Sequence, residues 1–210
     1  MKSMHDLMLH FLQDIYYAEK QGIRSMAKMA KSVDSAELKD AILKHRDQTL
    51  AQVSRLDQVF EELGKRARGK TCAAMDGLGE ECEEAIDESD RGPVLDAALI
   101  ACAQAIEHYE IARYGALVAW AKSLNMTQSA SLLQETLDEE HAADHLLNEI
   151  AQRALNAQAA ASGKPDEDGG EDEASETVEE PKPRPKPKPA AKKSPKTKPP
   201  ARSAGGPGKT

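Results

Sequence analysis

Residues 100–121 carry a stripe of side chains at alternating spacings of three and four residues, the spacing of the buried face of a bundle helix. The stripe consists of Ile100, Ala103, Glu107, Glu110, Tyr114, Leu117 and Ala121. Its middle holds two carboxylates and a phenol, where a helical bundle needs apolar groups. A buried carboxylate costs on the order of several kcal/mol unless it is paired, protonated or bound to a cation. This segment is therefore the first candidate for the chemistry of the chain.

Three further segments have the same periodicity, so the chain is predicted to be all-α and to contain no β-strand. The four long helices are predicted over residues 3–31, 36–63, 94–123 and 128–160. The connection over residues 65–93 is long for neighbouring helices and is expected to carry one or two short extra helices, one of them over residues 71–88. One long crossover is the connectivity of ferritin-like four-helix bundles, which is the predicted fold.

Polar groups interrupt the inward stripe of each of the other long helices as well. They are Glu19 in the first helix and His45, Thr49 and Gln52 in the second, with Gln48 beside His45. In the fourth helix, one inward stripe passes through Glu140 and Asp144 and a competing one passes through Glu139. The sequence leaves the choice between these two stripes open. Both place a carboxylate at mid-helix.

These polar groups are expected to share one layer of the bundle. Counted from the turn at residues 33–34, Glu19 is level with residue 48. Counted from residue 126, Glu107 and Glu110 are level with residues 145 and 142. A ring of carboxylates with imidazole is how carboxylate-bridged di-iron and di-manganese sites are built in helical bundles.

We therefore predict a di-metal site inside the bundle, and oxygen and imidazole ligands suit Fe or Mn. The predicted ligands are Glu19, His45, Glu107, Glu110, Glu140 and Asp144, with Gln48 as a neutral addition, and Tyr16 and Tyr114 are predicted to hydrogen-bond to these acids. His108 and His141 fall off the stripes and are predicted to lie on the surface. The alternative is a metal-free bundle in which the acids share protons with His45, Gln48 and the tyrosines.

Composition divides the chain into a domain and a tail. Residues 163–210 lack the apolar side chains needed for a core and are predicted to be disordered, so the folded domain is predicted over residues 1–162. Residues 164–180 hold nine acids and one lysine, whereas residues 181–210 hold ten Lys or Arg and no acid. Residues 1–163 then have 17 bases and 27 acids. This excess of acids argues against nucleic-acid binding through the general surface of the domain.

The basic half of the tail alternates lysine with proline and is expected to be extended. Such a segment neutralises phosphates without reading sequence, so non-specific DNA contact is expected. The predicted contacts are Lys182, Arg184, Lys186, Lys188, Lys192 and Lys193. The acidic segment upstream would compete for the same bases, and a solubilising linker is the alternative.

The remaining features indicate a cytoplasmic protein. No run of about 18 apolar residues is present, so no membrane span is expected. The N-terminal residues have acids within their apolar periodicity and are typical of a helix, not of a secretory signal. The chain has three cysteines, an odd number, and their spacing is not that of a metal site: Cys72, Cys82 and Cys102. This favours reduced thiols.

Several segments of this sequence resemble the YciF-like bacterial stress proteins, over about residues 3–151. They are Leu12-x-Asp14-x-Tyr16-x-Ala18-Glu19-Lys20-Gln21, Lys70-x-Cys72-x-Ala74-Met75-x-Gly77-Leu78-x-x-Glu81, Glu107-His108-Tyr109-Glu110-Ile111-Ala112-x-Tyr114-Gly115 and Leu132-Leu133-x-Glu135-Thr136-Leu137-x-Glu139-Glu140. The resemblance implies a ferritin-like bundle with short extra helices, a homodimer and a candidate di-metal site. It is consistent with a stress-response protein that handles iron or peroxide.

The sequence departs from the resemblance at one position that matters for the site. Where such proteins often read His-x-Glu-Glu-Thr, this chain reads His45-Arg46-Asp47-Gln48-Thr49. If that second glutamate is a ligand, Gln48 offers one neutral carbonyl in place of a bridging carboxylate. The consequence could be one tightly held metal ion instead of two.

Overall fold

The computed structural model describes residues 1–162, and over these residues the chain forms helices and no strand. The four long helices are α1 (Met4–Ser32), α2 (Ala36–Glu62), α4 (Pro93–Ser123) and α5 (Thr127–Ile150). Two shorter helices are α3 (Ala73–Glu88) and α6 (Asn156–Ser162). The prediction of an all-α fold is confirmed, and the crossover holds one extra helix, α3.

Local signals in the sequence account for the helix ends. Ser3 caps α1 in a reciprocal arrangement with Asp6, and the Ser35 side chain accepts a hydrogen bond from the backbone of Leu38 at the start of α2. Just beyond α2, Gly64 has a φ of 64°, a left-handed conformation that glycine adopts without strain. These caps place the two ends of α2, and so they set the height of its polar residues.

The predicted helix over residues 128–160 is not a single α-helix. A π-helical turn over Ala151–Leu155 separates α5 from α6. The five residues of this turn include no proline or glycine, so the sequence carries no signal that would have marked it.

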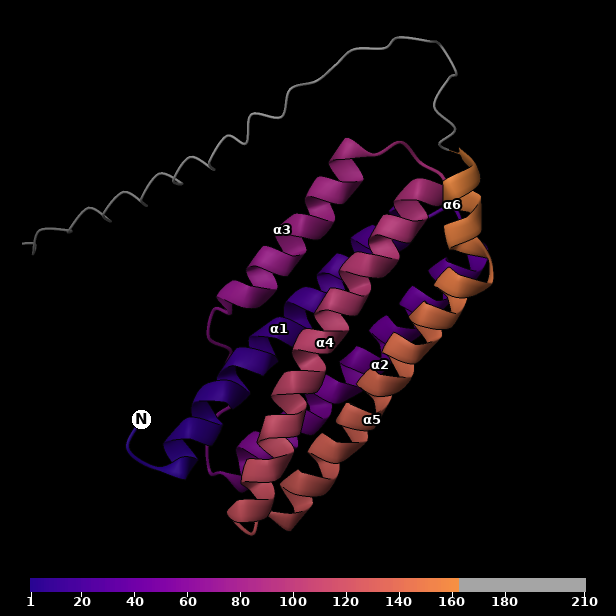
Figure 1. Ribbon diagram of the computed structural model, residues 1–210. Coiled ribbons are helices and arrows are strands. Elements are labelled where there is room, and N and C mark those ends of the chain that lie inside the picture. Colours follow the sequence, from indigo (N-terminus) through magenta and orange to yellow (C-terminus); the bar gives the residue numbers. More distant parts are fainter. Residues whose placement is uncertain (163–210) are drawn as a thin grey trace, which may run out of the picture. The chain divides into compact units, whose positions relative to one another are not determined.

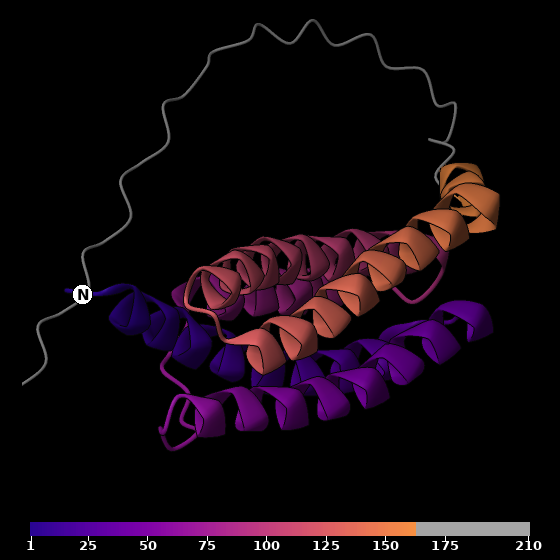
Figure 2. The ribbon, with the colours of Figure 1, turned by 90° about the horizontal axis from the view of Figure 1, so that it is seen from below.

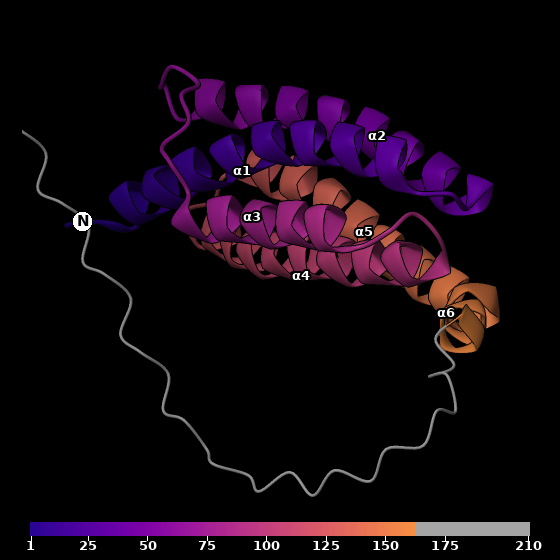
Figure 3. The same ribbon diagram turned by 90° about the horizontal axis from the view of Figure 1, so that it is seen from above.

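The long helices form a bundle in which α1 lies along α2 and α4 lies along α5 (Figure 1). Contacts between α2 and α5 and between α1 and α4 close the bundle. Seen from below, α1 and α2 form one layer and α4 and α5 the other (Figure 2). Helix α3 packs against α1 and α4, on the side away from α2 (Figure 3). Because α3 carries the chain back along the bundle, α2 and α4 run in the same direction, as the ferritin-like connectivity requires.

The core consists of two apolar clusters separated along the helices by a polar layer. One cluster contains Met8, Leu12, Ile15, Leu56, Phe60, Leu117 and Leu133. The other contains Met29, Leu38, Ile42, Leu99, Ile100, Leu147 and Ile150. Among residues 1–162, eight of the eleven buried polar residues lie in sequence between the residues named for these two clusters: Glu19, His45, Thr49, Gln52, Glu107, Glu110, Thr136 and Glu140.

No helix among residues 1–162 is long and apolar enough to cross a membrane. The predicted disorder of residues 163–210, and the predicted nucleic-acid contacts of the tail, lie outside the described residues.

Candidate metal centre

Four buried side chains from three helices converge in the polar layer. They are His45 of α2, Glu107 and Glu110 of α4, and Glu140 of α5, and each offers one potential ligand atom within 4.8 Å of those of the others. The Nε2 atom of His45 lies 3.2 Å from Oε1 of Glu107 and 3.3 Å from Oε2 of Glu140. We call these four residues the buried cluster. All four were predicted as ligands.

Glu19 brings a fourth carboxylate to the same layer from α1. Its side chain is fully buried, and Oε1 accepts a hydrogen bond from the hydroxyl group of Tyr114. Its charge is close enough to those of Glu110 and Glu140 to raise the pKa of both. Glu19 therefore adjoins the buried cluster.

The five residues leave buried polar atoms without partners among residues 1–162. The atoms are Glu19 Oε2, His45 Nδ1, Glu107 Oε2, Glu110 Oε1 and both carboxylate oxygens of Glu140, of which Oε2 has only its 3.3 Å contact with His45. Native proteins rarely leave buried polar atoms without hydrogen bonds, so each of these carboxylate oxygens needs an explanation. Four ionised carboxylates carry the charge that two divalent cations would balance. Both the donor types and the unsatisfied oxygens fit a carboxylate-bridged metal pair.

Burial shifts the pKa values of the acids upward. Burial raises the pKa of Glu19 to about 7, although the hydrogen bond from Tyr114 acts in the opposite direction. Burial and the neighbouring carboxylates raise the pKa of Glu110 well above its ordinary value. Burial raises the pKa of Glu140 as well, although its contact with His45 opposes the shift. In the absence of a cation, these acids hold protons that a metal ion would displace.

The imidazole of His45 lies between the carboxylates of Glu107 and Glu140. Burial alone would lower its pKa, but the contacts with Glu107 and Glu140 outweigh this and raise the pKa to about 11. Without metal, the imidazolium lies between two carboxylates and partly neutralises them. With metal, Nε2 would lose its proton and become a ligand.

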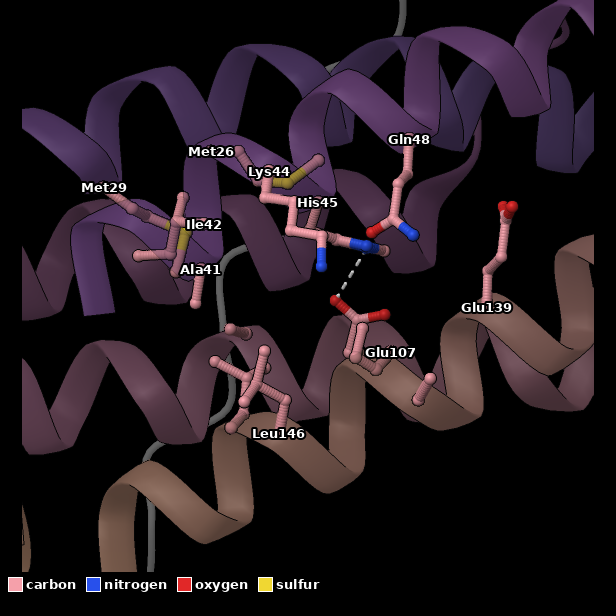
Figure 4. A pocket seen from close by; sticks show the side chains of 14 residues that line it. Met26, Met29, Ala41, Ile42, Lys44, His45, Gln48, Glu107, Glu139 and Leu146 are labelled. Atoms are coloured by element: carbon pink, nitrogen blue, oxygen red, sulfur yellow. Dashed lines mark ion pairs between the residues drawn. The ribbon is translucent and has the colours of Figure 1, made fainter. Parts of the chain in front are cut away.

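A pocket of about 100 Å³ reaches His45 and Glu107 (Figure 4). Gln48 is partly buried and lines this pocket. A second cavity of about 20 Å³ lies against His45, Glu107 and Glu110, which is room for about one water molecule. The cluster can thus be reached by small molecules without unfolding of the bundle.

The structure does not bring Asp144 into the cluster. Its carboxylate accepts a hydrogen bond from Gln104 at 3.0 Å and lies 3.2 Å from Nε2 of His108, and its side chain is 24% exposed. Beyond Glu140, the buried face of α5 continues two turns later with Leu147 and then Ile150. Asp144 therefore lies at the partly exposed edge of the contact between α4 and α5.

Glu139 is held outside the cluster by an arginine that sequence reasoning missed. Arg55 donates to both carboxylate oxygens of Glu139, at 2.7 and 2.8 Å, and to Glu135 at 2.6 Å, while Gln52 donates to Glu139 at 3.0 Å. This forked ion pair neutralises Glu139. The choice that the sequence left open is decided, because Glu140 is the acid that points inward. The only advance signal was the position of Arg55 one turn after Gln52, on the same face of α2.

The two predicted tyrosines have different roles. Tyr114 bonds to Glu19 as expected. Tyr16 does not reach the acids of the layer, because its hydroxyl donates to Asp57 at 2.9 Å and accepts from Lys20. His108 and His141 are exposed, as predicted.

Residues 3–160 match the family described as a domain of unknown function, DUF892. The chain is 43% identical over 160 residues to the protein YciF of Escherichia coli (strain K12), which covers 76% of this chain and 96% of YciF. The crystal structure of the E. coli stress protein YciF superposes with a TM-score of 0.71 at 43% identity, covering 74% of this chain and 99% of the other. The structure of YcfI from Rhodopseudomonas palustris gives a TM-score of 0.68 at 46% identity, covering 70% and 94%. The chain therefore belongs to the DUF892 family of YciF-like stress proteins.

Proposed function

We propose that this bundle binds two divalent transition-metal ions, Fe or Mn, at the buried cluster, and that it handles iron or peroxide as a cytoplasmic stress protein. The observation that carries the proposal is the set of buried carboxylate oxygens without hydrogen-bond donors at Glu19, Glu107, Glu110 and Glu140. No lysine or arginine side chain pairs with these oxygens among the described residues. A pair of cations offsets the cost of burying them.

Each residue has a task that follows from its position. Glu107 and Glu140 face the same imidazole nitrogen of His45, so these three groups can share one ion. Glu110 and Glu19 would supply carboxylates for a second ion. Bound ferrous ions would supply the two electrons needed to reduce one hydrogen peroxide, with two protons, to two water molecules. The two apolar clusters lie on either side of this layer along the helices, so small molecules reach it through the pocket at His45 and Glu107.

Metal analysis of full-length protein from cells supplemented with iron and manganese tests the proposal. We expect about one to two ions per chain for the wild type. Glu140→Gln should lower the metal content, because it removes a carboxylate from the cluster. Glu139→Gln is the matched control, since it changes the adjacent acid that Arg55 already neutralises. Equal metal contents in the two variants, or less than about 0.2 ion per chain in the wild type, would contradict the proposal.

If the wild-type protein folds but contains no metal, the second candidate function is favoured, that of a metal-free DNA-associated protein. The observation in its favour is the run of ten basic residues without an acid in residues 181–210. Gel-shift measurements at two salt concentrations, on the full chain and on a variant with Lys182, Lys186 and Lys188 changed to Gln, test it. Equal shifts for both would exclude these lysines as the contacts.

A further inference from the structure

The pocket that leads to the buried cluster has an apolar end and a polar end. Its apolar lining is Met26, Met29, Ala41, Ile42, Leu146 and Leu147. Figure 4 shows Met29, Ile42 and Leu146 on one side of the His45–Glu107 pair and Gln48 with Glu139 on the other. The pair lies between the two ends. A molecule in this pocket would therefore meet a hydrocarbon surface and the candidate metal ligands at once.

The size and lining of the pocket limit what it accepts. A volume of about 100 Å³ suits a molecule of a few carbon atoms, since an apolar cavity of roughly 150 Å³ holds benzene. Each methylene group buried against the apolar end would favour binding by roughly fourfold. A molecule as small and polar as hydrogen peroxide would gain nothing from this surface.

The charges around the pair limit the head group. Glu107 is paired with the imidazolium of His45, so it offers no free charge to a head group, and the ammonium group of Lys44, which also lines the pocket, is exposed to water that screens its charge. Glu139 contributes little charge because Arg55 neutralises it. The amide of Gln48 can both donate and accept a hydrogen bond. An uncharged head group with a hydroxyl-type donor and acceptor fits best.

We infer that this pocket binds a short alkyl hydroperoxide, with its alkyl group against Met26, Met29 and Leu146 and its hydroperoxyl group at His45 and Glu107. The reaction, unlike the binding, rests on the proposed metal function. Cleavage of the O–O bond consumes two protons and two electrons and yields one alcohol and one water. Two bound ferrous ions would supply the electrons. The substrate of the site is thus an organic hydroperoxide in preference to hydrogen peroxide.

The first test measures binding without chemistry. Full-length metal-free protein, labelled with ¹³C at its methionine methyl groups, is titrated with tert-butanol, the unreactive analogue of tert-butyl hydroperoxide. The methyl resonances of Met26 and Met29 should shift, while those of Met8 and Met75, buried elsewhere in the core, should not. Ala143→Leu fills the pocket and should abolish the shifts, whereas Ala112→Leu, at an exposed position of α4 outside the pocket, should preserve them.

The second test measures substrate preference with iron-loaded protein. The rate of iron oxidation should be at least about tenfold higher with tert-butyl hydroperoxide than with hydrogen peroxide, consistent with the methylene contribution. Ala143→Leu should lower this ratio without changing the iron content, and Ala112→Leu should leave it unchanged.

Three results would overturn the inference: equal shifts of all methionines, tighter binding of butyrate than of tert-butanol, or the same substrate ratio in Ala143→Leu as in the wild type. The proposed metal function fails separately, if iron does not bind or neither peroxide oxidises it. In that case the methyl shifts still decide whether the pocket binds a small neutral amphiphile.

Discussion

The hydroxyl group of Tyr114 in α4 donates a hydrogen bond to Glu19 in α1, at a point where both side chains are fully buried. Burial and the charge of Glu19 raise the pKa of Tyr114 well above its ordinary value, so the phenol keeps its proton. This contact links the two helix layers of the bundle beside the buried cluster. It also fixes one oxygen of Glu19 and leaves the other free to bind a cation.

Tyr114→Phe should destabilise the metal-free protein by about 1–3 kcal/mol, because it leaves a buried carboxylate without its donor. The hydrogen bond lowers the pKa of Glu19, so its loss raises that pKa further. The destabilisation should accordingly be larger at pH 8, where Glu19 ionises, than at pH 5. Urea unfolding at both pH values measures it. Tyr16→Phe is the control, since its hydroxyl bonds to Asp57, and it should show no such pH dependence.

The stability of the metal-free protein should fall as pH rises from about 5 to 8. The folded-state pKa of Glu19 is about 7 against an ordinary value of 4.5, so the folded chain holds more protons than the unfolded chain between these values. The pKa of His45 is raised from 6.5 to about 11, which acts in the same direction above pH 6.5. The stabilising contribution of His45 is complete below pH 6.5 and is lost as pH rises towards 11.

Metal should reverse this pH dependence, because a bound cation requires deprotonated ligands. Urea midpoints of metal-free and manganese-loaded protein at pH 5, 6.5 and 8 give the comparison. We expect the metal-free midpoint to decrease with pH and the stabilisation by manganese to increase. A metal-free midpoint that rises over this range would show that the buried acids are ionised without a cation.

Periodicity was enough to predict the helices and most of the polar layer, because an acid in an apolar stripe is visible in the sequence. It placed Glu107, Glu110 and His45 in one layer, and the structure brings them together. It could not choose between Glu139 and Glu140. Adjacent residues on a helix differ by about 100° in direction, and either can belong to a broad buried face. The choice depends on Arg55, which lies 84 residues from Glu139 in the sequence.

Contacts between distant segments also explain what the sequence analysis missed in the fold. Asp96, at the start of α4, is only 2% exposed, although nothing in its local sequence marks it as buried. Its two oxygens accept hydrogen bonds from the backbone N–H groups of Asp34 and Ser35, at 2.9 and 2.8 Å. The turn between α1 and α2 is thus fixed to α4. This link holds the heights of Glu19 and His45 in register with Glu107.

Asp96→Ala should lower the free energy of unfolding by about 2–4 kcal/mol, because two charge-assisted hydrogen bonds from the backbone N–H groups of Asp34 and Ser35 are lost. Asp96→Asn keeps one acceptor oxygen and should cost less. Chemical denaturation monitored by circular dichroism measures both changes. If the alanine variant unfolds at the wild-type denaturant concentration, the turn is not held by this contact.

Gln48→Glu should strengthen metal binding at the cluster. Gln48 lines the pocket beside His45 and Glu107, and a carboxylate there would add a negative charge and an anionic ligand next to the proposed ions. We expect roughly a tenfold gain in affinity for manganese, the size of effect that one ligand group commonly has. The same charge should destabilise the metal-free protein at pH 8, because it adds to four buried carboxylates that each already have an oxygen without a hydrogen-bond donor. Competition against a chelator measures the affinity, and urea unfolding measures the stability.

Asp47→Glu, at an exposed position of the same helix, is the control and should change neither the affinity nor the stability. Unchanged affinity in Gln48→Glu would mean that this position faces the pocket without reaching the metal, and that the ligands are limited to the carboxylates and the imidazole of the inner layer.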